Sequence, residues 1–217
     1  MKKIVWLLVA LTLLFALTSC GESELDEFID IFENSEPTVI TTYVTQENKI
    51  VTLQSSQVAT VYGQDFKIEY MQQSLQIPGP GMNEDEYIKT VSGEILYHNG
   101  QFSEDGGKTW TSEMPDSVTE SVKFDLDAAD IDEYELSDGD KKLSAILTAE
   151  QAAALLGIEI TANEDGVSLT IEHDGANLRK INIIYVTEDK TTVTIMTSYT
   201  YDAVKSPFET EEEPSQE

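Results

Sequence analysis

Few side chains in this chain of 217 residues have strong reactive potential. It has one cysteine, Cys20, and two histidines, His98 and His173. Gly-x-Ser-x-Gly, His-Glu-x-x-His and the phosphate-binding P-loop are absent, so no familiar catalytic spacing is present. Carboxylates are abundant, but a pair of them indicates acid–base chemistry only where the fold brings them together. The sequence therefore predicts a protein that is not an enzyme, with no cofactor and no bound metal.

Cys20 ends a segment that has the order of an export signal. Lys2 and Lys3 precede an apolar run from Ile4 to Leu17, and small residues separate this run from Cys20. A basic start, a short apolar stretch and a small-residue end are typical of a secretory signal. The run is also short for a membrane-spanning helix, which needs about 20 residues. We therefore expect residues 1–19 to be a signal peptide.

The last four residues of this segment, Leu17-Thr18-Ser19-Cys20, resemble the bacterial lipobox. The resemblance implies diacylglycerol on the Cys20 thiol, cleavage just before Cys20, and usually an acyl chain such as palmitate on the new amino terminus. Two or three acyl chains anchor a protein stably where one is marginal. The implied location is the bacterial cell membrane, facing outside the cytoplasm. The alternative is an ordinary exported protein with a free or intermolecularly paired thiol.

The charge balance is strongly acidic, with 13 Lys and Arg against 41 Asp and Glu and a formal net charge of −28. Such a surface repels the phosphates of nucleic acids and anionic lipid headgroups. We therefore expect no nucleic-acid partner, and membrane attachment through the lipid on Cys20. Solubility is the simplest explanation of the charge, and cationic partners or divalent ions are the alternative.

An acidic run between residues 125 and 140 raises the question of calcium, because hard cations favour clustered carboxylates. Its aspartates are Asp125, Asp127, Asp130, Asp132, Asp138 and Asp140. The EF-hand pattern fails, because Ala129 stands at a ligand position and Ala128–Ile131 lacks the glycine. We expect a solvated surface here, with calcium as the open alternative.

A short stretch after residue 102 carries a motif with a known structural role. Its defining residues are Ser103, Asp105, Gly107, Thr109 and Trp110. The spacing resembles the Asp box of sialidase-type propellers, which implies a carboxylate that accepts hydrogen bonds from turn amides and a tryptophan packed beneath the hairpin. A propeller repeats the box in successive blades, and this chain has one copy. We expect a structural turn and no glycosidase.

Hydrophobic periodicity predicts the elements that carry these residues. Leu25, Phe28, Ile29 and Phe32 have helical spacing, and from Thr38 the period changes to two. Asn99-Gly100 between β-rich runs predicts a hairpin with a type I′ turn. A helix is expected over residues 149–156, and three strands between residues 167 and 201. Short connections between successive strands predict antiparallel pairing.

These elements predict an α+β fold: a curved antiparallel β-sheet, or half-barrel, with one or two helices on the concave face. We expect a lipidated amino terminus, acidic tether and short helix over residues 20–37. We expect the antiparallel domain to cover residues 38–203 and residues 204–217 to form an acidic disordered tail.

The order of elements in Leu25–Asp202 resembles that of half-barrel lipoprotein carriers, the LolA-like and LppX/LprG-like families. The resemblance rests on the signal, the Gly93–Gly100 hairpin segment, the mid-chain helix and the closing strands. It implies a groove in the concave face that holds lipid or acyl chains.

The closing strands carry rows of apolar side chains. Together these rows form a wider apolar surface than the narrow apolar stripe of one short helix can cover. We therefore predict a partly uncovered groove, lined by Leu155, Leu169, Ile171, Ile183, Tyr185, Ile195 and Tyr199. The leading hypothesis is a monomeric, membrane-anchored lipoprotein that binds a lipid or other apolar ligand there. The alternative is a structural or protein-interaction lipoprotein of the cell envelope without a small-molecule ligand.

Overall fold

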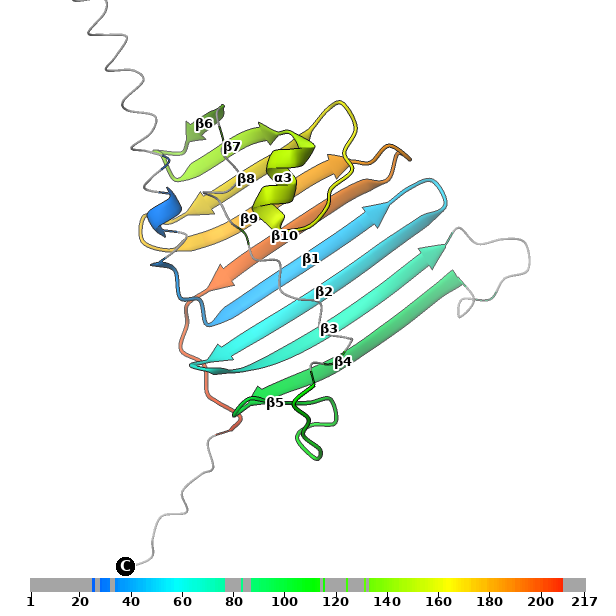
Figure 1. The fold of residues 1–217 in the computed structure, drawn as a ribbon, viewed down its shortest axis with the longest axis vertical. Coiled ribbons are helices and arrows are strands. Elements are labelled where there is room, and N and C mark those ends of the chain that lie inside the picture. Colours follow the sequence, from blue (N-terminus) through cyan, green and yellow to red (C-terminus); the bar gives the residue numbers. More distant parts are fainter. Residues whose placement is uncertain are drawn as a thin grey trace, which may run out of the picture.

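The computed structural model describes residues 34–76, 87–113 and 133–208, together with residues 25, 28–31, 83, 115, 124 and 131. The expected signal peptide, Cys20, most of the acidic run and the tail beyond residue 208 lie outside the described residues. The described part is dominated by one open sheet of ten antiparallel strands (Figure 1). The strands are β1 (Val39–Glu47), β2 (Val51–Tyr62), β3 (Asp65–Gln76), β4 (Ile88–His98), β5 (Gln101–Ser103), β6 (Tyr134–Ser137), β7 (Lys142–Leu147), β8 (Val167–His173), β9 (Leu178–Val186) and β10 (Thr192–Thr200).

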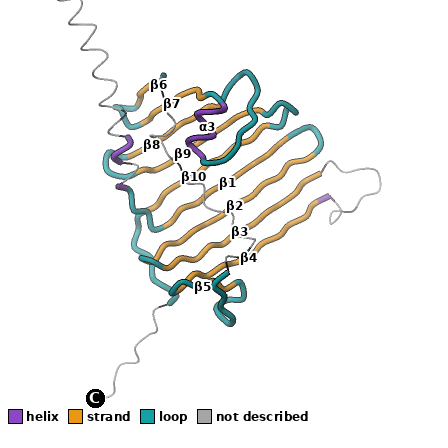
Figure 2. The backbone as a smooth tube through the Cα atoms, viewed as in Figure 1, coloured by secondary structure: helices purple, strands orange, loops and turns teal. Residues whose placement is uncertain are grey.

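The sheet consists of two meanders that meet along the first and last strands. Its order is β5-β4-β3-β2-β1-β10-β9-β8-β7-β6. β1 pairs with β10 from Val39 opposite Thr200 to Glu47 opposite Thr192, which joins the two meanders into one surface. Figure 2 shows these strands running side by side across the molecule. The expected antiparallel arrangement is confirmed.

Helix α3 (Ala149–Leu156) covers one face of the sheet over the closing strands (Figure 1). It begins after Thr148, whose side chain forms a capping box with Gln151, and ends at Gly157, where φ is +64°. Its apolar side packs into the main core. We call the face that carries α3 the inner face, and the opposite face the outer face. The inner-face core comprises Phe28, Phe124, Ile131, Leu143, Ala145, Leu147, Ala152, Leu155, Leu156, Ile160, Val167, Leu169, Ile171, Leu178, Ile181, Ile183, Val193 and Ile195.

Helical residues 28–31 pack against the same half of the sheet. Phe28 is buried, and its ring meets the His173 ring edge-on at a centroid distance of 4.4 Å. The Ser35 hydroxyl accepts a hydrogen bond from the Leu178 amide at 3.0 Å. These contacts agree with a short helix packed on the sheet. Among the described helices, none is long and apolar enough to cross a membrane.

The connection from β5 to β6 joins opposite edges of the sheet. Two of its described residues, Phe124 and Ile131, are buried within the inner-face core. This connection therefore contributes side chains to the same core layer as α3.

The Asn99-Gly100 turn has the expected geometry, with φ of +51° and +80° at the two central residues.

Three features were not expected. β4 begins at Ile88, well before the hairpin signal, and β3 continues to Gln76. β6 lies in the acidic stretch where sequence periodicity is ambiguous. These segments are rich in Gln, Ser, Thr and Glu, so their apolar alternation is weak.

Candidate functional site

The apolar residues predicted to line a groove beside α3 are packed instead. Leu155, Leu169, Ile171 and Ile183 are each at most 1% exposed, and Ile195 is 5% exposed. They belong to the core that α3, Phe28 and the β5–β6 connection complete. The prediction of an uncovered groove at these positions is therefore corrected, because more of the chain covers them than the stripe of α3 alone.

Tyr185 and Tyr199, the other two predicted groove residues, are partly buried against the same core. Burial raises the pKa of both phenols above the ordinary value, and Tyr201 adds a smaller increase at Tyr199. Both side chains thus remain neutral at physiological pH. They act as amphipathic packing groups at the margin of the core.

The inner face does not end at the core. Register places Ile183, Ile195, Val44, Ser55, Gln72 and Val91 in one row that crosses six strands, from β9 to β4. Exposure rises along this row, from 1% at Ile183 and 5% at Ile195 to 60% at Val91. The next row contains Val193, Gln46, Leu53, Ser74 and Lys89, and Leu53 is 43% exposed. One continuous surface therefore passes from packed core to an open region on β1–β4.

Charge is segregated between the two faces of β1–β4. The strand period of two and the register place all four acidic residues of these strands on the outer face: Glu47, Asp65, Glu69 and Glu94. The inner face of the same strands carries Lys89 as its single charged residue. In a protein of formal charge −28, the described strands β1–β4 contribute no anionic side chain to the inner face.

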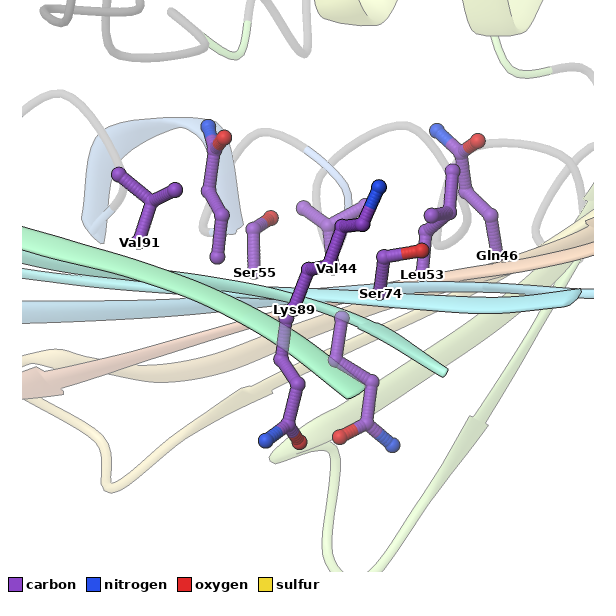
Figure 3. A pocket seen from close by; sticks show the side chains of 10 residues that line it. Val44, Gln46, Leu53, Ser55, Ser74, Lys89 and Val91 are labelled. Atoms are coloured by element: carbon purple, nitrogen blue, oxygen red, sulfur yellow. The ribbon is translucent and has the colours of Figure 1, made fainter. Parts of the chain in front are cut away.

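The open region contains a hollow of about 340 Å³. Figure 3 shows Val44, Gln46, Leu53, Ser55 and Ser74 rising from the same side of the strands. Gln72, Lys89 and Val91 complete the inner-face lining, while Gln54 and Gln73 border the hollow from the other side of the sheet. We call this feature the β1–β4 hollow. Its volume lies near the lower end for small-molecule sites, which are about 300–1,000 Å³.

Tyr70 separates the β1–β4 hollow from a packed aromatic end of the inner face. Its ring lies over Gly93 on the neighbouring strand, where a side-chain carbon would clash with it. Beyond this point Ile95 is fully buried, and Phe66 stacks on Tyr97 with ring centroids 4.6 Å apart. The hollow is thus bounded by aromatic packing at one end and by the core at Val193 and Ile195 on one side.

The inner-face lining of the hollow combines three aliphatic side chains with two amides, two hydroxyls and one ammonium group. Within the described part of the chain, the side chains of Gln46, Gln72, Ser55, Ser74 and Lys89 form no hydrogen bond or ion pair with one another or with other residues. None of the described residues that line the hollow carries a carboxylate, thiol or imidazole. The hollow can therefore bind apolar surface and offer hydrogen-bond donors to a polar group.

His98 lies on the outer face and has a structural set of partners. Its Nδ1 is 2.8 Å from Asp65 Oδ2, and its Nε2 accepts a hydrogen bond from Asn99 Nδ2 at 2.7 Å. The hydrogen bond with His98, supported by the Asn99 amide, holds the pKa of Asp65 below its usual value. The His98 ring also stacks on Phe208, with centroids 4.6 Å apart. This arrangement ties the chain after β10 to the hairpin end of the sheet.

His173 is buried at the opposite end of the sheet. Its Nδ1 accepts a hydrogen bond from the Gly175 amide at 3.1 Å, and its Nε2 donates to the Asp140 carbonyl at 3.0 Å. Both ring nitrogens are therefore used to fix neighbouring turns. The two histidines lie on strands β4 and β8, at separate parts of the sheet.

The Asp-box residues form the turn network that their spacing indicates. Asp105 accepts hydrogen bonds from the Ser103 hydroxyl, the Lys108 and Thr109 amides and the Thr109 hydroxyl, at 2.7–3.0 Å. Trp110 Nε1 donates to the Gly107 carbonyl at 3.0 Å. The hydrogen bonds from Thr109 are the main cause that lowers the pKa of Asp105 to about 2. All of these hydrogen bonds join residues of the turn itself.

Replacing Asp105 by Ala is expected to lower the midpoint of urea unfolding at pH 7, because the turn amides lose their acceptor. The Asn variant should fall between Ala and the natural protein, since it retains one carbonyl oxygen. The lowered pKa means that the stabilisation is complete above about pH 4 and is lost as the pH falls toward 2. Unfolding midpoints measured across this range check the prediction; an Ala variant with an unchanged midpoint at pH 7 would contradict it.

Metal binding has no obvious site in the part of the chain that the structure describes, where no three or more His, Cys, Asp or Glu side chains cluster suitably. Four aspartates of the predicted acidic run, Asp125, Asp127, Asp130 and Asp132, lie outside that part. Comparison of the chain with protein-family models finds no match, and comparison with curated proteins finds none either.

Proposed function

We propose that this protein is a lipid-anchored, non-enzymatic binding module of the cell envelope that holds an apolar or amphipathic ligand on the inner face of a half-barrel sheet. Lipid on Cys20 attaches it to the outer side of the bacterial cell membrane, and the folded domain works as a monomer. The ligand site is the β1–β4 hollow, beside the packed positions first expected.

One observation carries this proposal: the inner face remains open where the core ends. Leu53 and Val91 are 43% and 60% exposed although they lie on the same face as residues of the core. Burying exposed apolar surface is favourable by about 25 cal/mol per Å². A ligand with an apolar part therefore gains free energy by extending the core layer over β1–β4.

Native mass spectrometry of residues 21–217 tests the proposal. The protein is purified from a lipid-containing bacterial host without detergent, and spectra are recorded before and after extraction with organic solvent. We expect an adduct of lipid mass that disappears on extraction and returns when the host lipid extract is added back. Spectra of the bare chain under all three conditions would contradict ligand binding.

A second candidate function is protein interaction through the outer face. Tyr43, Met71 and Ile184 are 46%, 43% and 39% exposed on this face, on strands β1, β3 and β9. Their scatter among Ser, Thr and Gln side chains favours a partner surface less strongly than the hollow favours a ligand. Stable co-purification of an envelope protein that is lost in a Tyr43→Glu/Met71→Glu variant, with no lipid adduct, would favour this candidate.

A further inference from the structure

We propose that the β1–β4 hollow selects a single-chain anionic amphiphile of the fatty-acid type, with the carboxylate at Lys89 and the acyl chain running across β3 and β2 toward the core. This inference rests on the proposed function and specifies the ligand class of the same site. Its structural basis is that the inner face changes from charged and polar at Lys89 to apolar where it meets the core.

Lys89 is a cation without an anionic partner in the described structure. Among the other basic side chains of the sheet, Lys67 pairs with Glu69 and Glu94 at 3.3 and 2.9 Å, and Lys142 pairs with Glu172 at 3.6 Å. Lys180 on β9 forms no ion pair in the described structure either, but the register places it on the outer face. The acidic residues of β1–β4 lie on the outer face, so none of them on these strands competes for Lys89 from the inner face. A ligand anion is therefore attracted here, whereas the strongly acidic protein repels it elsewhere.

The register gives the acyl chain a path. From Lys89 the row continues through Ser74 and Leu53 to Gln46, and then to Val193, which is buried in the core. Neighbouring strands lie about 4.8 Å apart, so Lys89 and Gln46 are separated by roughly 14 Å across three strand spacings. Val91 and Val44 belong to the adjacent row and flank this path. The headgroup end is thus polar and charged, and the far end meets apolar core.

Size and polarity restrict the occupant further. A hollow of about 340 Å³ suits one slender chain better than the several chains of a large lipid. The amides of Gln46 and Gln72 and the hydroxyls of Ser55 and Ser74 add donors along the hollow. One fixed positive charge matches one carboxylate, so the site discriminates an ionised fatty acid from a neutral alcohol of equal length.

Photo-crosslinking of the full, lipid-anchored chain in phosphatidylcholine nanodiscs tests this selectivity. The two probes, supplied in trace amounts, are a diazirine-bearing palmitate and a diazirine-bearing hexadecanol with the same chain. The measurement is made at alkaline pH, where the carboxylate is ionised and lysine keeps its charge. We expect the palmitate probe to label β1–β4 peptides about twofold to fivefold more than the alcohol, the range of one solvent-accessible ion pair.

Lys89→Gln should reduce this ratio to about one, while Lys89→Arg should preserve it because the positive charge remains. Lys49→Gln is the matched control, since it removes an exposed lysine from the β1–β2 turn without altering the inner face. A ratio unchanged in Lys89→Gln, or lost equally in Lys49→Gln, would overturn the role of Lys89. Equal labelling by both probes in the natural protein would overturn the anion preference and leave the proposed function intact. Absence of labelling by both probes would overturn the two proposals together.

Discussion

Replacing Leu169 by Ala is expected to lower the free energy of unfolding by about 2–5 kcal/mol, the usual cost of truncating a fully buried leucine. Leu169 is inaccessible to solvent and lies opposite Ile183 and Ala145 on the neighbouring strands. α3 and the β5–β6 connection close the core over this layer, so the cavity left by the substitution has no direct route to water. Urea unfolding of residues 21–217, followed by circular dichroism, measures the change.

Val91→Ala is the matched control, because Val91 lies on the same face and in a linked row but is 60% exposed. Its free energy of unfolding should change by no more than about 0.5 kcal/mol, as for other surface substitutions. Comparing the two variants therefore distinguishes a core position from an exposed position on the same face of the sheet. Equal destabilisation by the two substitutions would show that β1–β4 is packed as tightly as β7–β10, and would remove the open surface on which the proposed site depends.

Replacing Cys20 by Ala is expected to move the protein from the membrane fraction to the soluble or periplasmic fraction, or to leave an uncleaved precursor. The reason is chemical: alanine has no thiol to receive diacylglycerol, and the anchor depends on two or three acyl chains. Fractionation followed by intact-mass measurement detects both outcomes, because the natural protein should carry the added lipid mass.

Ser19→Ala serves as the control for this experiment, because it keeps a small residue before Cys20 and leaves the thiol in place. Its membrane retention and lipid mass should match those of the natural protein. Retention of Cys20→Ala in the membrane at the natural level, with normal cleavage, would rule out lipid attachment at this cysteine.

The closing half of the fold was predictable because its sequence is unambiguous. Val167, Leu169 and Ile171 alternate with polar residues, and Thr148 and Gly157 mark the ends of α3. Asn99-Gly100 fixed the hairpin because both residues tolerate positive φ. Local chemistry decides each of these features, so no knowledge of distant parts of the chain was needed.

The pairing of β1 with β10 and the cover on the core could not be predicted in the same way. They depend on residues far apart in the sequence, such as Thr42 and Thr197, whose hydroxyls lie 3.2 Å apart. Phe124 and Ile131 are isolated apolar residues in an acidic stretch, and only the fold shows that they fill the groove expected beside α3.

The candidate site was missed because its residues are individually unremarkable. Gln46, Leu53, Gln72 and Lys89 come from four strands and gather only through the register. One signal was present in the sequence. Separating alternate positions within the β-rich runs shows that the acidic residues of β1–β4 fall on one face, which leaves the other face of these strands without carboxylates.

The location of a bound acyl chain tests the central claim most directly. The full chain in phosphatidylcholine nanodiscs is irradiated with the diazirine palmitate, and the modified residues are identified by peptide sequencing. The account predicts adducts at inner-face positions of β1–β4, including Leu53 and Val91, and a loss of these adducts in a Leu53→Asp/Val91→Asp variant that unfolds at the natural urea midpoint. Adducts confined to outer-face residues such as Tyr43 and Met71, or unchanged in that variant, would contradict it.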